Sequence, residues 1–318
     1  MSSSFVLYLL RRALWTLPTL LLVALLVFVL MRLIPGDPAQ LILGDSGTAE
    51  QLADLRSQLG LDQPLVVQFG VWLSHMVRGD LGHSITTNEA VLPLLFERFQ
   101  VSATIVLVAV AAAAAIAVPA GLFAAWKQNS LADTTIVAGA TLFLSIPSFW
   151  LGLLLLLLFG LKLGWVPVVG YVAFSEDWRA ALSYLLLPIV TLTLIEMGVL
   201  TRMARASAIE TLRLEYVTHA RAKGLSELRV LLRHVLPNAF APTWTMIGLV
   251  LGNLLGGIAV LETVFTLPGL GRLLVDAIFA RDYPVVQGCL LFTAIIYVVV
   301  NLVVDLFYPL FDPRVATS

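Results

Sequence analysis

The sequence carries little charge. Asp, Glu, Lys and Arg together make up 12% of the 318 residues, and apolar residues make up 59%, whereas about a quarter of an average soluble domain is charged. The formal net charge of −1 provides no basic excess with which to attract nucleic acid. We therefore predict an integral protein of the lipid bilayer that binds no nucleic acid.

Cysteine and the motifs of common catalytic sites are also nearly absent. The single cysteine, Cys289, lies in an apolar run and cannot form an internal disulfide. The sequence contains no GxxxxGK[ST] phosphate-binding motif and no HExxH motif, and its four histidines are scattered along the chain. We predict that the chain is not an enzyme by itself and that it binds no metal and no cofactor.

Long apolar runs are the main feature that is present. Six of them cover residues 13–33, 102–126, 134–161, 184–199, 239–261 and 285–307. An apolar run of about 20 residues can cross a bilayer as a helix. The first run is too long for the core of a signal peptide and has no small-residue cleavage site, so we expect it to be retained. The predicted fold class is an all-α membrane protein with six transmembrane helices.

Basic residues predict the orientation of these helices. Arg11 and Arg12 precede the first run, and the polar loop at 202–237 is rich in arginine and lysine. Because such residues concentrate on the cytoplasmic side of a membrane, we predict that both termini and this loop are cytoplasmic.

The predicted spans divide the chain into four parts. Residues 1–33 form the N-terminal cytoplasmic end and the first transmembrane helix, and residues 34–100 form a small helical extracytoplasmic segment. Residues 101–311 form a core of five transmembrane helices that includes the loop at 202–237, and residues 312–318 form a cytoplasmic tail.

Two helices are expected in the extracytoplasmic segment. Thr48 and Gln51 have the spacing of a capping box, and Gly60 is expected to end the helix that follows, whose apolar stripe is Leu52, Leu55 and Leu59. Residues 65–77 predict a second, amphipathic helix.

The loop at 202–237 predicts two helices separated by a glycine. Residues 211–223 contain no Pro or Gly and are expected to form one helix, which Gly224 ends. Ser226 is expected to cap a second helix that Pro237 stops, with an apolar face made of Leu225, Leu228, Leu232 and Val235. We interpret this hairpin as a docking element for a soluble partner. The alternative is a solvated basic loop with no partner.

The loop resembles the EAA-type cytoplasmic loop of ABC importer permeases. The family pattern is EAA, three residues, a glycine, nine residues and then I-x-L-P, and here Ala220, Gly224, Leu236 and Pro237 have this spacing. The segment reads closest to the peptide/nickel branch of the family, whose loop contains TARAKG.

This sequence departs from the general pattern at three positions. Thr218 and His219 stand in place of Glu and Ala, and His234 stands in place of Ile. Further segments nevertheless resemble the same branch, in the same order along the chain, from about Leu9 to Pro313: LIPGDPA, LGLDQPL, GDLGHS, SIPSFW, ETVFTLPGLG and RDYPVVQG.

The resemblance implies the type I ABC importer permease fold and a set of partners. The chain would be a B-type permease of the bacterial cytoplasmic (inner) membrane, paired with a second, C-type permease. Two ATPase subunits would hold ATP and Mg, and an extracytoplasmic binding protein would deliver di- or oligopeptides. The residues that would couple to the ATPase are Tyr216, Ala220, Arg221, Ala222, Lys223, Gly224, Leu236 and Pro237. Nickel or other metal chelates and glutathione are alternative substrates within this family.

Polar residues inside the predicted spans suggest a translocation pathway. Glu196 and Asn253 are costly to place in lipid and are expected to face a cavity or another helix. Ser145, Pro147 and Ser148 would bend the third span and offer hydroxyl groups to the pathway. In both cases the alternative is structural: a hydrogen bond between helices, or an ordinary proline kink with back-bonded serines.

The segment ETVFTLPGLG predicts a gate at the outer side. Glu262, Pro268 and Gly269 are its candidate residues, and a plain outer loop is the alternative. Two functions of other classes also remain open: an ion-coupled carrier that uses Glu196 as its proton site, and a membrane scaffold that transports nothing. The absence of a repeated half argues against the carrier.

Overall fold

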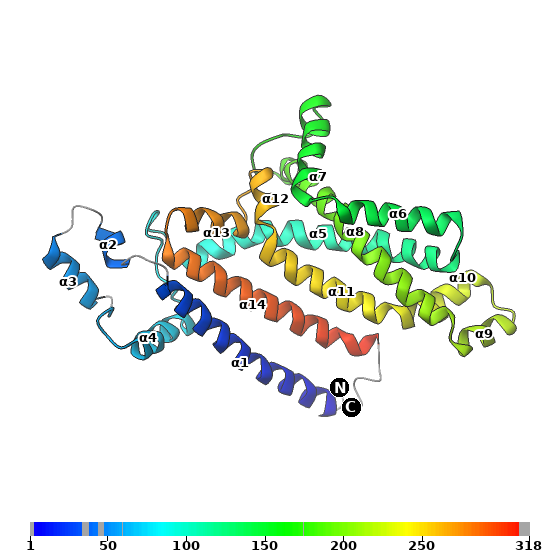
Figure 1. The fold of residues 1–318 in the computed structure, drawn as a ribbon, viewed down its shortest axis with the longest axis horizontal. Helices are drawn as coiled ribbons and strands as arrows, with labels where there is room; N and C mark the ends of the chain where they lie inside the picture. The colour runs from blue at the N-terminus through cyan, green and yellow to red at the C-terminus, as the bar shows by residue number, and fades with distance from the viewer. Residues whose placement is uncertain (1–2, 34–37, 44–47, 59, 174, 312–318) are drawn as a thin grey trace.

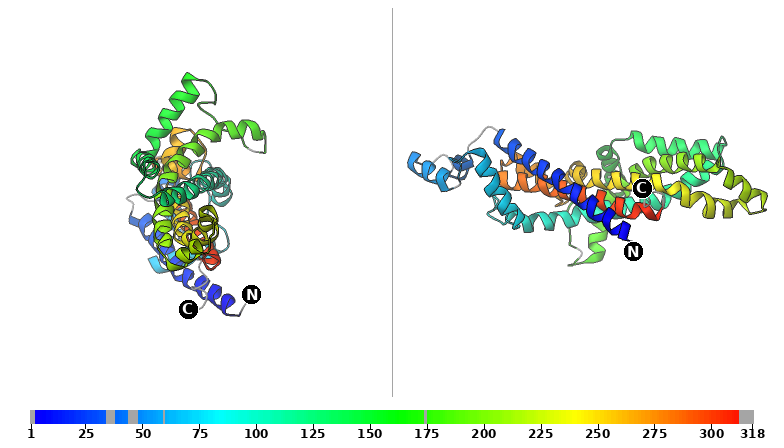
Figure 2. Two further views of the ribbon diagram at one scale, coloured as in Figure 1. Left: turned by 90° about the vertical axis from the view of Figure 1, so that its right-hand side faces the viewer. Right: turned by 90° about the horizontal axis from the view of Figure 1, so that it is seen from below.

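The computed structural model describes residues 3–33, 38–43, 48–58, 60–173 and 175–311. In these ranges the chain is helical and contains no strand, apart from one isolated bridge between His83 and Ala90 (Figure 1). The helices form an elongated bundle, with α9 and α10 at one end and α2 and α3 at the other (Figure 2).

The first span is α1 (Ser3–Leu33), and three short helices follow it: α2 (Pro38–Leu43), α3 (Ala49–Gln58) and α4 (Leu65–Val77). The capping box before α3 is confirmed, because the backbone N–H of Gln51 donates to Thr48 Oγ1 and that of Thr48 donates to Gln51 Oε1. Gly60 follows α3 with φ +64°, whereas Leu59 of the predicted stripe lies outside the described residues.

Helices α5 (Val91–Trp126) and α8 (Trp178–Leu212) pack along each other at the centre of the bundle. The alanines Ala109, Ala113 and Ala117 are buried in this contact region, as expected for close helix packing in lipid. At Gly121 an added Cβ would lie 2.7 Å from the carbonyl oxygen of Thr201, so the two backbones approach closely.

Both central helices are longer than predicted. Helix α5 begins eleven residues before the predicted span at 102, and it therefore runs through the predicted boundary between 100 and 101. Helix α8 continues through 202–212, which was predicted to belong to the loop. Residues 94–101 and 202–212 contain no Pro or Gly, so each helix extends beyond the apolar run. Pro93 lies in the first turn of α5, where its missing N–H is not needed.

The third predicted span is broken rather than straight. Helices α6 (Leu131–Ser145) and α7 (Ser148–Leu155), the latter extended by a π-helix, η1 (Leu156–Lys162), meet at an angle of 97°. The bend predicted at Ser145, Pro147 and Ser148 is therefore confirmed, and it divides the predicted span at 134–161 into two helices. Pro147 adopts an extended conformation that ends α6 and begins α7, and α7 projects away from the bundle (Figure 1).

After α8 the chain forms α9 (Glu215–Ala222), α10 (Glu227–Val230), a π-helical turn η2 (Leu231–Val235) and α11 (Leu236–Gly257). The prediction of one helix over 211–223 is wrong, because α8 ends at Leu212 and a turn at Arg213–Leu214 separates it from α9. Pro237 does not stop a helix either. It lies in the first turn of α11, where its missing N–H is not needed.

The chain ends with α12 (Ala259–Val264), α13 (Leu270–Phe279), α14 (Tyr283–Phe307) and a 3₁₀ turn, η3 (Tyr308–Leu310). Helix α14 packs against α1 and α11. Five helices of the described chain are long and apolar enough to cross a membrane, and the bent pair α6–α7 brings the number to six. The predicted tail at 312–318 lies outside the described residues.

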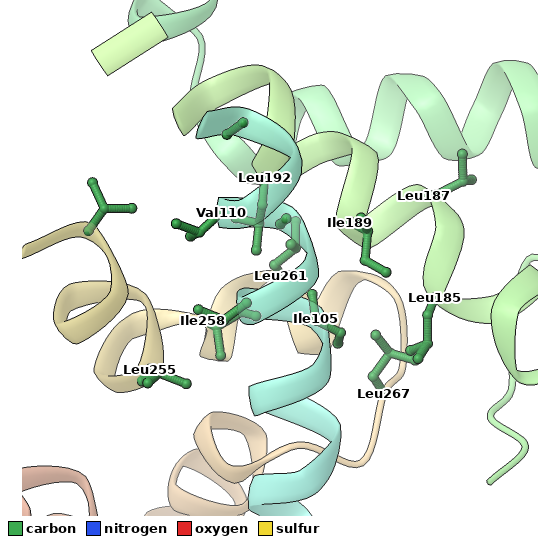
Figure 3. Close-up of a cluster of buried hydrophobic side chains, with 14 of the residues drawn as sticks. Ile105, Val110, Leu185, Leu187, Ile189, Leu192, Leu255, Ile258, Leu261 and Leu267 are labelled. Atoms are coloured by element: carbon green, nitrogen blue, oxygen red, sulfur yellow. The ribbon is translucent and has the colours of Figure 1, made fainter. Parts of the chain in front are cut away.

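Side chains of α5, α8, α11, α12 and the α12–α13 turn form the main core (Figure 3). Ile105, Leu185 and Leu267 are almost fully buried in it. Because lipid is as apolar as these side chains, close packing and not removal from water holds the helices together. This core fixes the relative positions of the helices that carry the candidate site. Cys289 is buried in a second apolar cluster.

Candidate functional site

The hairpin α9–α10 turns through a Schellman motif at Gly224. The N–H of Leu225 donates to the carbonyl of Ala220 (3.4 Å), and the N–H of Gly224 donates to the carbonyl of Arg221 (2.9 Å). Gly224 has φ +80°, a conformation that residues with a Cβ rarely adopt. The predicted glycine turn is therefore confirmed, with its backbone hydrogen bonds in place.

One face of the hairpin is anchored to the bundle. Val217 and Ala220 of α9 pack with Val230, Leu231 and Val235, and the cluster continues into the ends of α5, α8 and α11 through Leu122, Ala125, Ala208 and Ala239. Because the three valines are fully buried, the hairpin cannot move without these helix ends.

The apolar face predicted for the second helix is wrong in part. Leu228 and Leu232 are 67% and 52% exposed, whereas Val230, Leu231 and Val235 are buried. The π-helical turn shifts the helix register after residue 230, and a regular period of 3.6 residues could not show this. The two exposed leucines instead give the free side of the hairpin an apolar patch.

Two side-chain contacts hold the hairpin closed. Arg221 and Glu227 form a bidentate ion pair across the turn, with Nε–Oε1 and Nη2–Oε2 distances of 2.9 and 3.2 Å. The hydroxyl of Tyr216 donates to the carbonyl of His234 at 3.3 Å. Ser226 occupies the N-cap position of α10, but its side chain makes no capping hydrogen bond, contrary to the prediction.

The remaining predicted coupling residues lie on or beside the same hairpin. Ala222, Lys223 and Pro237 are exposed, and Leu236 is half-buried against the anchoring cluster. The structure thus brings the predicted coupling residues together on one projecting element at the end of the bundle (Figure 1).

A second ion pair braces the neighbouring helices. Asp133 of α6 accepts from Arg205 of α8 in a bidentate arrangement, with Oδ1–Nε and Oδ2–Nη2 distances of 2.6 and 2.7 Å. The N–H of Asn129 also donates to Asp133, whose own N–H donates to the N-cap hydroxyl of Ser130. The pair fixes α6 to α8 just beyond the segment that the hairpin contacts.

The predicted pathway residues are placed on helices that pack together. Glu196 of α8 is half-buried, and no described residue forms a hydrogen bond or ion pair with its side chain. Asn253 is exposed on α11, which packs against α8. Among the described residues, neither side chain forms a hydrogen bond with another helix.

The serines of the bend behave differently from each other. Ser145 is exposed and its hydroxyl donates to the carbonyl of Thr141 at 2.8 Å, which is the back-bonded arrangement of an ordinary helix. Ser148 is half-buried in the first turn of α7. The hydroxyl of Ser145 is therefore already used within its own helix.

The predicted outer-gate residues meet at the start of α13. Glu262 is fully buried, accepts a short hydrogen bond from the hydroxyl of Ser102 and also accepts the N–H of Arg272 at 2.8 Å. A Cβ added to Gly269 would overlap the carboxylate of Glu262. The carboxylate thus holds the N-terminus of α13, where the helix dipole favours negative charge, and Glu262 is not an interfacial group.

A small cavity of about 250 Å³ adjoins this turn. Arg98, Pro268, Gly269, Arg272 and Asp276 are among its lining residues, and the buried Nε of Arg98 has no hydrogen-bond partner. The predicted gate segment is therefore a turn with a charged recess beside it.

Two segments that the sequence analysis singled out separately meet near this end. In GDLGHS and RDYPVVQG, Ser84 and Asp282 are 198 positions apart, yet the hydroxyl of Ser84 donates to the Asp282 carboxylate. The N–H groups of Ile85 and Thr86 donate to the same carboxylate at 3.2 and 3.3 Å. Burial alone would raise the pKa of Asp282, but these hydrogen bonds outweigh it, so the pKa lies below its ordinary value.

Sequence reasoning missed the groups that join distant elements. Asp133 could have been found, since Ser130 stands three positions before it in the spacing of a capping box. Nothing local marks Asp282 as the partner of Ser84, or Ser102 as the partner of Glu262.

The sequence matches two family descriptions that together cover almost the whole chain. Residues 117–317 match the binding-protein-dependent transport system inner membrane component, and residues 5–111 match the N-terminal part of the same kind of membrane component. The chain is 43% identical over 306 residues to a peptide transport system permease protein of Brucella abortus, covering 96% of this chain and 98% of that protein.

Other relatives and one solved structure agree with this match. The chain is 41% identical to a glutathione transport system permease protein of Salmonella choleraesuis and 38% identical to a dipeptide transport system permease protein of Alkalihalophilus pseudofirmus, each covering 97% of this chain and 98% of the relative. A chain of the inward-facing MetNI methionine ABC transporter superposes with a TM-score of 0.56 at 19% identity, over 71% of this chain and 97% of that one. The fold is that of a type I ABC importer permease.

Proposed function

The chain belongs to the family of inner-membrane components of binding-protein-dependent transport systems, and we propose that it is the B-type permease of an ATP-driven importer of di- and oligopeptides. It forms half of the translocation pathway, and a second, C-type permease forms the other half. Two ATPase subunits hold ATP and Mg, and a binding protein delivers the substrate from the opposite side. The peptide, dipeptide and glutathione permeases among its relatives support this substrate class.

The proposed orientation places the hairpin and both termini in the cytoplasm of a bacterium. Helix α1 begins, and α14 ends, towards the end of the bundle that carries α9 and α10 (Figure 1). The basic residues Arg221, Lys223, Arg229 and Arg233 lie exposed on the hairpin. Positive charge at this end is what the positive-inside rule requires of the cytoplasmic side.

The observation that carries the proposal is the construction of the hairpin. Its buried face joins the ends of α5, α8 and α11, and its free face exposes Leu228, Leu232 and a glycine turn with open space around it. Closure of the ATPase dimer moves the docked hairpin, and the anchored helix ends follow it because their shared cluster is buried. The two permeases then open outward, and the substrate passes from the binding protein into the cavity between them.

The pathway side chains complete this mechanism. Glu196 and Asn253 line the route, and Ser148 stands at the bend where α7 leaves the bundle. The segment with Glu262, Pro268 and Gly269 forms the outer gate. The buried carboxylate of Glu262 holds this segment in place at the N-terminus of α13. An unpaired carboxylate and amide in the route suit the amino and carbonyl groups of a peptide.

The test is reconstitution of the chain with its C-type partner and ATPase subunits in proteoliposomes, with the binding protein supplied outside. We expect ATP-dependent uptake of a labelled dipeptide, with glutathione and a nickel chelate compared at equal concentration. Uptake of only the chelate or glutathione would overturn the peptide assignment within the same family. Uptake by this chain alone without ATP would favour the ion-coupled carrier, and failure of any ATPase to copurify would favour the scaffold.

A further inference from the structure

A groove of about 900 Å³ lies between the last turns of α1 and the start of α4, at the end of the bundle far from the hairpin. Leu25, Phe28 and Val29 form one wall, and Leu65, Val66 and Phe69 form the other. The transport mechanism above uses none of these side chains.

Helix α4 has the character of a helix at a membrane surface. It is 13 residues long and mostly apolar, yet none of its residues is buried, and Val66 and Val77 are 82% and 76% exposed. Such a helix presents its apolar side to the boundary between headgroups and acyl chains.

Helix α4 is also fixed to a membrane span. Phe28 of α1 contacts Phe69 and Trp72 of α4, with ring centroids 5.3 and 5.7 Å apart. Trp72 packs together with Ala24 and Val27 in a small apolar cluster. Because α1 is apolar enough to cross the membrane, the groove beside it opens towards acyl chains, and apolar walls do not retain water.

The mouth of the groove carries a cation and an unmatched acceptor. The guanidinium of Arg32 lies 5.1 Å from the centroid of the Phe28 ring, and no carboxylate of the described chain pairs with it. Gln68 donates from Nε2 to the carbonyls of Leu61 and Gln63 at 3.1 and 2.7 Å, which fixes its amide orientation. Its buried Oε1 then has no hydrogen-bond partner.

Arg56 and Asp62 also line the groove, so its charged side chains sum to one positive charge. A ligand that satisfies the site therefore needs an apolar chain, an anionic group for Arg32 and a hydrogen-bond donor for Gln68. A membrane phospholipid with a hydroxyl or ammonium headgroup has all three.

We propose that this groove binds one phospholipid of the bilayer. An acyl chain lies along the groove between Val29 of α1 and Val66 of α4, beside the contact of Phe28 with Phe69. The phosphate pairs with Arg32 through charge-assisted hydrogen bonds, and the headgroup hydroxyl or ammonium donates to Gln68. The lipid thereby fills the space between the first span and the helix at the membrane surface. This inference depends on the fold and not on the identity of the transported substrate.

The test uses the full chain purified from membranes in a mild detergent, with bound phospholipid counted by mass spectrometry of the intact protein. Three variants address the site: Arg32→Ala removes the cation, Gln68→Leu removes the acceptor, and Val29→Trp fills the groove. Arg78→Ala and Leu22→Trp are matched controls, because these exposed residues of the same region do not line the groove.

We expect the unaltered chain and both controls to retain one phospholipid more than Arg32→Ala and Val29→Trp. Rebinding of phosphatidylglycerol or phosphatidylethanolamine from nanodiscs should be about tenfold weaker for Arg32→Ala, the loss of a charge-assisted hydrogen bond. Arg32→Lys keeps the charge and should retain the lipid, which separates loss of binding from loss of folding.

Equal lipid counts in Val29→Trp and Leu22→Trp would overturn the proposal, as would equal counts in the two alanine variants. Inorganic phosphate offered alone distinguishes the source of the anion. If it displaces the bound lipid or binds Arg32 as tightly as the lipid does, the site is a phosphate site and the proposal is wrong.

Discussion

Gly224 offers the sharpest test of the docking hairpin. Its φ of +80° is unfavourable for a residue with a Cβ, by roughly 1–2 kcal/mol, yet a Cβ added there meets no atom within 4 Å. A larger side chain at this position therefore costs a little backbone strain and causes no clash inside the chain. Any greater effect has to arise from a partner that fits closely around the turn.

Gly164 is a matched control for this position. It has φ +63° and equally open surroundings, but it lies between η1 and α8, away from the hairpin. We expect alanine at either glycine to lower the free energy of unfolding by a similar amount, about 1 kcal/mol. Asparagine should have a smaller effect at both, since it tolerates this conformation.

Tryptophan should separate the two positions. An indole forced into a close-fitting groove costs about 1–3 kcal/mol, which corresponds to roughly a 5- to 150-fold loss of docking affinity. We expect Gly224→Trp to reduce ATP-driven uptake by the assembled complex within this range, and Gly164→Trp to leave it nearly unchanged. ATP hydrolysis and uptake should be measured on the same proteoliposomes.

The docking argument fails if Gly224→Trp transports substrate as well as Gly164→Trp. It also fails if Gly224→Asn loses as much uptake as Gly224→Trp, because the cause would then be the backbone at the turn and not the bulk of the side chain.

Three further predictions concern stability. Asp133→Asn breaks a bidentate ion pair and should lower the free energy of unfolding. The expected loss is towards the lower end of about 3–5 kcal/mol, because the side chain of Arg205 is a quarter exposed. An unchanged denaturation midpoint would contradict this prediction. Gly269→Ala pushes a methyl group into the Glu262 carboxylate and should lower the free energy of unfolding by about 1–3 kcal/mol. Gly257→Ala is the control, because a Cβ added there meets no atom within 4 Å. It should have no packing cost in the same thermal unfolding assay. The lowered pKa of Asp282 implies stabilisation that is complete above about pH 4, the ordinary pKa, and is lost as pH falls through the lower folded value. The destabilisation caused by Asp282→Asn should therefore be constant from about pH 5 to about pH 8 and shrink only in stronger acid, and a change within that window would refute the assignment.

Local patterns predicted much of the fold because they report on local physics. The apolar runs located α1 and α14, and their predicted ends at 33 and 307 agree with the structure. The capping box at Thr48 and the glycine turn at Gly224 were predicted correctly, since each depends on residues within one turn of helix. The predicted end of α5 at 126 is also correct, but its predicted start and both predicted bounds of α8 were wrong, because hydropathy detects only the apolar part of a helix and not its polar extension.

Only those parts of the candidate site that are formed by residues close together in the sequence could be predicted. The coupling residues gather on one hairpin as expected, but a π-helical turn reversed which leucines are buried, and no residue in that segment signals it. The bend at Pro147 was predicted, but a single sequence does not give its angle of 97°. The partnerships of Ser84 with Asp282 and of Ser102 with Glu262 join residues more than 150 positions apart, and a single sequence carries no record of them.

Helix α8 has a consequence for the geometry of the whole assembly. At about 1.5 Å per residue, its 35 residues measure roughly 52 Å, whereas the hydrocarbon layer is about 30 Å thick. Even if it is tilted, a helix of this length has to extend beyond the hydrocarbon layer. The stretch that contains Arg202 and Arg205 is the polar end of this helix and is expected to lie outside the hydrocarbon layer, next to the hairpin that follows it. A partner docked on the hairpin, as proposed above, would therefore be held at a distance from the lipid headgroups.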